Sequence, residues 1–232
     1  MEFLADGAVR AARLLAGGSR EVWGAVWISV WVAFVSTCAA SVVGLPVGYA
    51  VAVGRFRGRR AALVLLNALL GVPSVGIGLL VFSFLSRRGP LGSWGLLYTP
   101  AAMVIGQALL AAPIAAALTR AAVSGLDPRA LKTAASLGAG PVRSALTAAR
   151  ELGPALTAAV MAAFGRVFGE VGISLMLGGN ILFYTRNITT SIALETARGE
   201  FGLGLALGAI LVMVSFAINL VVHAMRGSEE AR

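Results

Sequence analysis

Residues 22–54 read VWGAVWISVWVAFVSTCAASVVGLPVGYAVAVG and contain no Asp, Glu, Lys, Arg or His. The run exceeds the roughly 20 apolar residues that a helix needs to cross the hydrocarbon core of a bilayer. A strand of a membrane barrel would instead alternate apolar and polar residues over about 10 positions. Backbone N–H and C=O groups in hydrocarbon must bond within the chain, so this run predicts a membrane-spanning helix.

The rest of the chain repeats this pattern. Hydrophobic residues make up 58% of the 232 positions and charged residues 12%, against about 25% charged residues in a soluble domain. Further apolar stretches of comparable length lie at 61–86, 89–119, 155–177 and 201–222. Only the stretch at 155–177 contains charged residues, Arg166 and Glu170. We therefore expect an all-α fold, a polytopic transmembrane helical bundle of about five spans.

The basic residues predict the orientation of this bundle, because cytoplasmic loops are enriched in Lys and Arg near the ends of spans. Residues 54–60, GRFRGRR, and the break at 120–151 are rich in Arg, so we expect both inside. Alternation then places the N-terminus, residues 87–95 and residues 178–187 outside, with Arg87 and Arg88 as exceptions to the rule. The net charge of +9 is scattered over helix ends, which argues against nucleic-acid binding.

The two ends of the chain are expected to lie outside the bundle. Residues 1–21 begin with acidic residues and lack a long apolar core, so they do not resemble a signal peptide. Their apolar residues, spaced among arginines, predict a short interfacial helix. We expect a single transmembrane domain over residues 22–225, with the 120–151 loop in the cytoplasm, and a cytoplasmic tail at 226–232.

Residue types that carry catalysis are scarce. His223 is the single histidine and Cys38 the single cysteine, which leaves no transition-metal site and no intrachain disulfide. We expect Cys38 to pack within its span. Neither a G-x-x-x-x-G-K-[ST] phosphate loop nor a G-x-S-x-G nucleophile motif is present. We therefore expect no enzyme activity and no cofactor; energy for pumping would come from an ion gradient or from a partner ATPase.

The break at 120–151 is long enough to form structure of its own. Asp127 can cap a helix with Pro128 at the first helical position, and Gly138 can adopt the left-handed conformation that ends it. Pro141 would then begin a second helix. Such a short, Ala-faced helix with a glycine turn is either a connector between two spans or a close-packing surface for a partner, and spacing alone leaves both open.

Within this break, AASLGAG at 134–140, followed by ELGPAL at 151–156, resembles the coupling loop of permease subunits in ATP-binding cassette (ABC) importers. In that family the loop helix inserts into a groove of the ATPase. The resemblance implies ATPase coupling by Leu131, Lys132, Thr133, Ala134, Ala135, Leu137, Gly138, Ala139 and Gly140. Lys132 and Thr133 depart from the Glu and Ala that begin the family's pattern.

The resemblance covers nearly the whole chain, from about Phe3 to Met225. GLPVGYAVA at 44–52 and GVPSVGIGLLVFSFLSRRGPLG at 71–92 are similar to the tungstate and molybdate branch of these permeases, as is the segment from Phe164 to Phe201. This resemblance implies the ABC importer permease fold (MetI/ModB-like). It also implies a homodimer in the membrane lipid whose partners are an ABC ATPase subunit and an extracytoplasmic solute-binding protein.

The segment from Phe164 to Phe201 also bears on the substrate. Its GGNI, TR and TTSIALE motifs, in this order, resemble the tungstate permeases more than the molybdate or sulfate ones, which implies tungstate as the substrate, with molybdate or sulfate as alternatives. An ATP-independent secondary transporter or channel is a more distant alternative. It would need intramembrane acidic relays, and Glu170 is the only acid within a predicted span.

Two groups of polar residues are candidates for the translocation path. Arg166 and Glu170 stand four apart, share one helix face and should face the bundle interior, either as a structural pair or as part of a gate. The predicted outer segment is rich in hydrogen-bond donors that suit a tetrahedral oxyanion, or that merely cap helices. These residues are Asn180, Thr185, Arg186, Asn187, Thr189 and Thr190.

Two prolines are expected to break their spans near the middle of the membrane. Pro46 lies between Gly44 and Gly48, and Pro73 lies between Gly71 and Gly76. Proline removes a backbone hydrogen bond, and flanking glycines let a neighbouring helix approach. The resulting bends are either hinges or static kinks.

Overall fold

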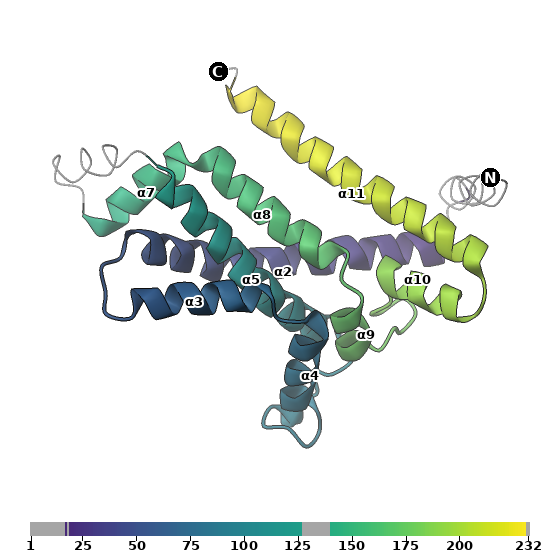
Figure 1. Ribbon diagram of the computed structural model, residues 1–232. Helices are drawn as coiled ribbons and strands as arrows, with labels where there is room; N and C mark the ends of the chain where they lie inside the picture. The colour runs from purple at the N-terminus through teal and green to yellow at the C-terminus, as the bar shows by residue number, and fades with distance from the viewer. Residues whose placement is uncertain (1–16, 18, 127–139, 231–232) are drawn as a thin grey trace. The chain divides into compact units, whose positions relative to one another are not determined.

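The computed structural model describes residues 17, 19–126 and 140–230, and all its regular elements in these ranges are helices. In chain order they are α2 (Arg20–Val53), α3 (Arg59–Leu70), α4 (Ser74–Leu85), the 3₁₀ turn η1 (Gly92–Trp94), α5 (Pro100–Ser124), α7 (Pro141–Glu151), α8 (Gly153–Phe168), α9 (Gly172–Gly178), α10 (Ile188–Ala197) and α11 (Phe201–Glu230). Figure 1 shows their course. The predicted all-α class is confirmed.

Three helices of the described residues are long and apolar enough to cross a membrane alone: α2, α5 and α11 over Phe201–Val222. Two bent pairs also qualify, α3 with α4 at 99° and α8 with α9 at 63°. The predicted five spans are reached when each bent pair counts as one span. The apolar stretches at 61–86 and 155–177 are thus broken helices; the break in the second was not predicted from its sequence.

The predicted proline breaks have opposite outcomes. Pro73 does break its stretch: α3 ends at Leu70, and Pro73 stands in an extended conformation directly before α4. Its fixed φ and missing N–H cannot continue a helix. The predicted break at Pro46 is wrong, because α2 runs uninterrupted through this residue.

Tight contacts hold α2 against α5 around Pro46. A Cβ added to Gly44 would lie 2.8 Å from Ala112 O, and one added to Gly48 would lie 2.8 Å from Thr119 Cβ. Two glycines four residues apart allow this close helix approach. α2 therefore continues as one helix past Pro46, with α5 packed closely on both sides of the proline.

Two further expectations differ from the structure. The apolar stretch at 89–119 contains one span, as predicted, but its helix α5 begins only at Pro100, after a turn region that includes η1 and extends beyond the predicted loop at 87–95. Tyr98 has φ 64° and Gly95 φ 62°, so the backbone there is incompatible with a helix. Cys38, expected to pack, is exposed.

The chain divides into two compact units that interleave along the sequence. Of the described residues, those in 17–36, 73–107 and 165–230 form unit 1, and those in 37–72 and 108–164 form unit 2. In unit 1, buried residues of α2, α10 and α11 form one apolar core: Val22, Ala25, Val26, Ile188, Ala206, Leu207 and Ile210.

The short helix α9 is also buried within unit 1. A Cβ at Gly106 of α5 would lie 2.7 Å from Ile173 Cγ2, and one at Gly78 of α4 would lie 2.9 Å from Met176 Sδ. These glycines let α4 and α5 approach α9 closely, which positions the break before α9 inside the protein.

Candidate functional site

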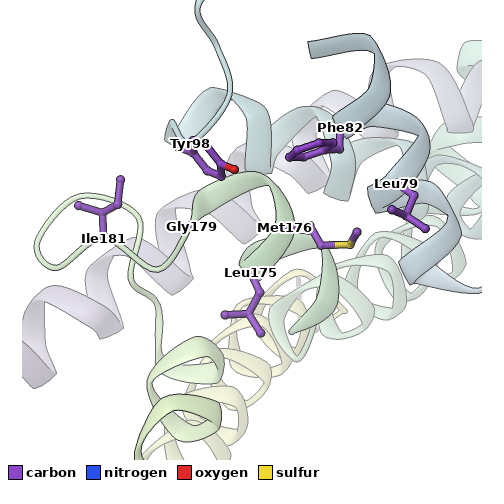
Figure 2. Close-up of a pocket in the computed structure, with 7 residues that line it drawn as sticks. All are labelled: Leu79, Phe82, Tyr98, Leu175, Met176, Gly179 and Ile181. Atoms are coloured by element: carbon purple, nitrogen blue, oxygen red, sulfur yellow. The ribbon is translucent and has the colours of Figure 1, made fainter. Parts of the chain in front are cut away.

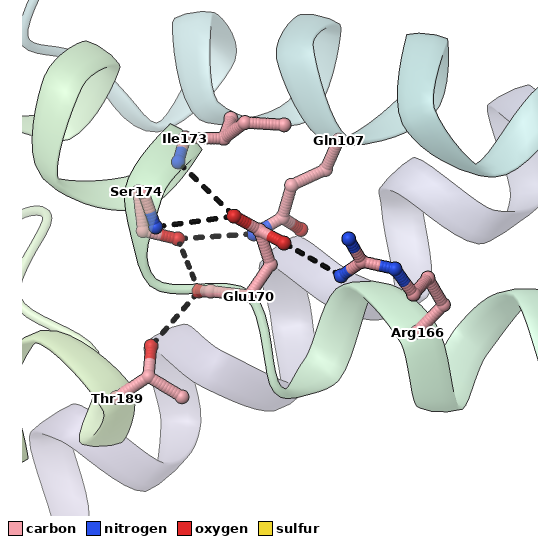
Figure 3. Close-up of polar contacts among 7 residues, drawn as sticks. Gln107, Arg166, Glu170, Ile173, Ser174 and Thr189 are labelled. Carbon is pink, nitrogen blue, oxygen red and sulfur yellow. Dashed lines mark hydrogen bonds and ion pairs between the residues drawn. The ribbon is translucent and has the colours of Figure 1, made fainter. Parts of the chain in front are cut away.

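The break between α8 and α9 is organised by the side chain of Glu170, which is buried although it lies in an apolar stretch. Its Oε2 accepts a hydrogen bond from Arg166 Nη1 at 2.6 Å. Its Oε1 accepts from the backbone N–H groups of Gly172 at 3.1 Å and Ile173 at 3.4 Å. The predicted Arg166–Glu170 pair is therefore present, and the same carboxylate caps the start of α9 (Figure 3).

The two members of this pair differ in exposure. The Glu170 side chain is 5% exposed, whereas the Arg166 side chain is 42% exposed. Beside Arg166, a Cβ added to Gly165 would meet nothing within 4 Å. An arginine at membrane depth is costly when it faces lipid. We therefore expect the open side of Arg166 to face water or another polypeptide.

The carbonyl of Glu170 is the next link in a buried hydrogen-bond network. It accepts from Ser174 Oγ at 3.1 Å and from Thr189 Oγ1 at 3.0 Å (Figure 3). Ser174 Oγ in turn accepts from Gln107 Nε2 at 3.1 Å and Asn187 Nδ2 at 3.1 Å. The break frees this carbonyl from helix bonding, and these hydroxyl groups replace the missing partner.

The network extends to a fourth helix, α2, through Gln107, whose Oε1 accepts a hydrogen bond from Ser36 Oγ at 3.3 Å. We call Ser36, Gln107, Glu170, Ser174, Asn187 and Thr189 the polar cluster. All six are less than 5% exposed. The cluster links α2, α5, the α8–α9 break and α10 within unit 1, because each of these elements contributes at least one of its hydrogen bonds.

Sequence reasoning missed three members of the polar cluster: Ser36, Gln107 and Ser174. A signal for one of them was present, since Gln107 is the only amide side chain in the apolar stretch at 89–119. A buried amide in a membrane needs partners. Which partners it finds depends on helices far away in the chain.

The predicted outer donors fall into two groups in the structure. Thr185, Thr189 and Thr190 are buried and bonded within the chain. Thr185 Oγ1 donates to Gly178 O at 2.5 Å, and Thr190 forms a capping box with Asn187 at the start of α10. These hydroxyl groups stabilise the turn from α9 to α10.

Asn180 and Arg186 form the second group. Among the described residues, Asn180 Oδ1 and Arg186 Nε are buried atoms without a hydrogen-bond partner. Asn180 also has a positive φ of 53°. Arg186 borders a small cavity of about 110 Å³, which Glu21, Ser191 and Glu195 also line. Of the predicted outer residues, these two retain hydrogen-bonding capacity.

An apolar groove lies on the other side of α9. It has a volume of about 680 Å³ and is lined by Leu79, Phe82, Tyr98, Leu175, Met176, Gly179 and Ile181 (Figure 2). No charged side chain lines it. The Tyr98 hydroxyl group is the only polar side-chain group among the lining residues, so this groove is poorly suited to an oxyanion.

The predicted coupling residues Leu131 to Ala139 lie outside the described residues. Gly140 is described and exposed, and its carbonyl accepts a hydrogen bond from Ser144 N at 2.9 Å. The helix α7 begins at Pro141, as predicted. Among the described residues, no group of three or more His, Cys, Asp or Glu side chains could hold a metal ion.

Removal of the Ser174 hydroxyl group tests the polar cluster. Ser174→Ala takes one partner from each of Gln107 Nε2, Asn187 Nδ2 and Glu170 O, so we expect the free energy of unfolding to fall by about 1–3 kcal/mol. Thermal unfolding of the purified full chain in micelles measures this. Ser83→Ala is the control, because Ser83 is exposed and bonds only to its own helix. Equal melting temperatures for both variants would contradict a stabilising cluster.

Comparison with known proteins identifies a family of membrane transport components. The family described as "Binding-protein-dependent transport system inner membrane component" matches residues 44–227. The tungstate uptake system permease protein TupB of Peptoclostridium acidaminophilum is 39% identical over 226 residues, 97% of this chain and 99% of its own length. TupB of Campylobacter jejuni is 34% identical over 97% of this chain and 95% of its own length.

An archaeal relative is similar over a shorter range. A probable anion ABC transporter permease protein of Haloferax volcanii is 37% identical over 198 residues, 83% of this chain and 85% of its own length. The family match covers more than half of the chain, and these relatives match most of it. The chain therefore belongs to the binding-protein-dependent transport system inner membrane components.

Proposed function

We propose that this chain is the membrane subunit of an ATP-driven importer that moves tungstate into the cytoplasm. The observation that carries this proposal is the similarity to two tungstate uptake permeases over 97% of the chain. The chain is a multi-pass protein of the plasma membrane and a transport component rather than an enzyme. A solute-binding protein outside the cell would deliver the oxyanion.

The Arg166–Glu170 pair is suited to a transient contact with an oxyanion. A dianion about 4 Å from the exposed side of Arg166 would gain about 8 kcal/mol at an effective dielectric constant of about 20, and Glu170 about 7 Å away would offset about 5 of these. The remaining attraction of about 3 kcal/mol permits both capture and release. We therefore place this pair in the gate of the passage.

Among the outer residues, Arg186 is the better candidate for contact with the arriving oxyanion. Its Nε–H is a buried donor without a partner, whereas the unpartnered atom of Asn180 is the acceptor Oδ1, which would repel an anion, and the hydroxyl groups of Thr185, Thr189 and Thr190 are bonded within the chain. In this proposal the three threonines stabilise the outer turn, Arg186 lies at the outer end of the path, and Asn180 contacts the oxyanion only if its amide NH₂ group turns toward it.

The cytoplasmic loop would couple ATP hydrolysis by the partner to movement of the membrane helices. We propose that the chain works as a homodimer and that each copy contacts one ABC ATPase subunit through residues 131–140. Gly140 is exposed directly before α7, which agrees with an accessible surface at this end of the loop. ATP-driven closure of the two ATPases would then move α7 and α8 and open the gate.

Reconstitution of the chain with its ATPase and its solute-binding protein in vesicles tests this function. We expect ATP-dependent uptake of tungstate, with molybdate and sulfate competing more weakly, and no uptake without ATP. Equal competition by molybdate or sulfate would make this an importer of that oxyanion instead. Uptake driven by an ion gradient in vesicles without the ATPase would contradict the importer.

A further inference from the structure

The turn between α2 and α3, residues Gly54 to Gly58, has a defined shape. Arg59 Nε donates to Val51 O at 2.9 Å and its Nη2 donates to Ala52 O at 3.2 Å, so this side chain caps the C-terminal carbonyls of α2. Gly58 has φ 91°, which favours glycine. The turn is therefore held by side-chain bonds as well as by its backbone.

This turn presents three positive charges that have no counter-charge. Arg55, Arg57 and Arg60 are exposed, and among the described residues no carboxylate lies within 4.0 Å of their guanidinium groups. Arg55 and Arg57 line a pocket of about 650 Å³ that is formed by residues 52–57 and Arg59. The Arg59 side chain already donates hydrogen bonds to carbonyl groups of α2, whereas Arg55, Arg57 and Arg60 are free to contact an anion.

Apolar side chains adjoin these charges. Val53 is 44% exposed and Phe56 46% exposed, next to the arginines in sequence. The helix α3 continues this surface with exposed Val64, Leu65, Leu69 and Leu70, and Leu66 is its only buried residue. A soluble anion would need only the arginines. An amphiphile would use both the charges and the apolar helix.

The length of α3 agrees with one lipid leaflet. A helix of 12 residues is about 18 Å long, against about 15 Å for half of the hydrocarbon core. The chain then bends by 99° into α4. The arginines stand at the end of α3 that sequence analysis places at the cytoplasmic surface, where anionic lipid headgroups attract basic residues.

We propose that the α2–α3 turn and α3 bind one anionic phospholipid of the cytoplasmic leaflet. Its phosphate group contacts Arg55, Arg57 and Arg60, and an acyl chain lies along the exposed face of α3. This inference depends on the membrane location of the chain and on the orientation predicted from its loops. It does not depend on tungstate transport or on the ATPase.

Lipid binding by the purified full chain in an uncharged detergent tests this site. The probe is fluorescent phosphatidylglycerol, compared with phosphatidylcholine that carries the same acyl chains and label. We expect phosphatidylglycerol to bind more tightly. Arg55→Gln, Arg57→Gln and Arg60→Gln together should weaken it about 100-fold, because each arginine near an anionic surface contributes about a factor of five. The matched Arg→Lys triple variant should keep most of the affinity.

The control removes three exposed arginines elsewhere, Arg87, Arg88 and Arg150, and so has the same net charge. We expect it to bind phosphatidylglycerol within threefold of the unaltered chain. If the Gln triple variant does not fold, the single variant Arg57→Gln replaces it in the experiment. We expect its affinity for phosphatidylglycerol to be about fivefold weaker than that of the unaltered chain.

Three results would overturn the proposal. The first is equal affinity of the Gln variants and the unaltered chain for phosphatidylglycerol. The second is displacement of the lipid by millimolar inorganic phosphate, which would show a site for a soluble anion. The third is a Gln triple variant that keeps lipid binding and no longer co-purifies with the ATPase, which would make this turn a protein contact.

Discussion

Gly138→Trp is expected to abolish ATP-driven uptake while the protein remains in the membrane. Gly138 lies in the predicted coupling loop, where small residues allow close contact with the ATPase. An indole group there would hold the two surfaces apart, and loss of about 3 kcal/mol of contact energy weakens binding more than 100-fold. Co-purification with the ATPase and uptake by reconstituted vesicles measure the effect.

Gly208→Trp is the matched control for this experiment. Gly208 lies within α11, outside both motifs of the coupling-loop resemblance, and a Cβ added there would meet nothing within 4 Å. We expect this variant to retain most of its uptake. Normal uptake by Gly138→Trp would contradict the assignment of residues 131–140 as the coupling surface.

Glu170→Lys is expected to prevent recovery of folded protein. The change places an ammonium group beside the guanidinium group of Arg166 and removes the acceptor for the N–H groups of Gly172 and Ile173. Because the Arg166 side chain is 42% exposed, the ion pair alone contributes less than a fully buried pair. Each buried N–H group left without an acceptor costs about 1–3 kcal/mol, and two are affected, which is a large part of the total stability of a domain. Size-exclusion elution and thermal unfolding of the solubilised protein measure this.

Glu195→Lys serves as the control, because Glu195 also pairs with an arginine, Arg198, at 3.1 Å. The Arg198 side chain is 58% exposed, so this pair contributes about 0–1 kcal/mol and we expect folded protein. The charge swap Arg166→Glu with Glu170→Lys separates the two roles of Glu170. It restores an ion pair, but lysine cannot accept bonds from the start of α9, so we expect only partial rescue.

A fully stable and active Glu170→Lys variant would contradict both roles. Full rescue by the charge swap would leave the ion pair as the only contribution of Glu170. Either result would show that capping of α9 by Glu170 does not stabilise the α8–α9 break.

Local composition determined much of this protein. Uncharged runs long enough to cross a bilayer predicted the helical class and up to five spans, because a membrane leaves a backbone few ways to satisfy its hydrogen bonds. Pro73 ended its helix and Pro141 began one, since proline acts on its own backbone. The spacing of Arg166 and Glu170 predicted their pair, because residues four apart share a helix face.

Tertiary structure decided the rest. Pro46 stays within a helix whose flanking glycines pack against α5, and the partner residues lie in a distant part of the chain. Ser36 meets Gln107, and Gln107 meets Ser174, across 71 and 67 positions of sequence. Pattern rules describe neighbours in sequence, whereas the partners of Gln107 depend on which distant helices supply a donor or an acceptor.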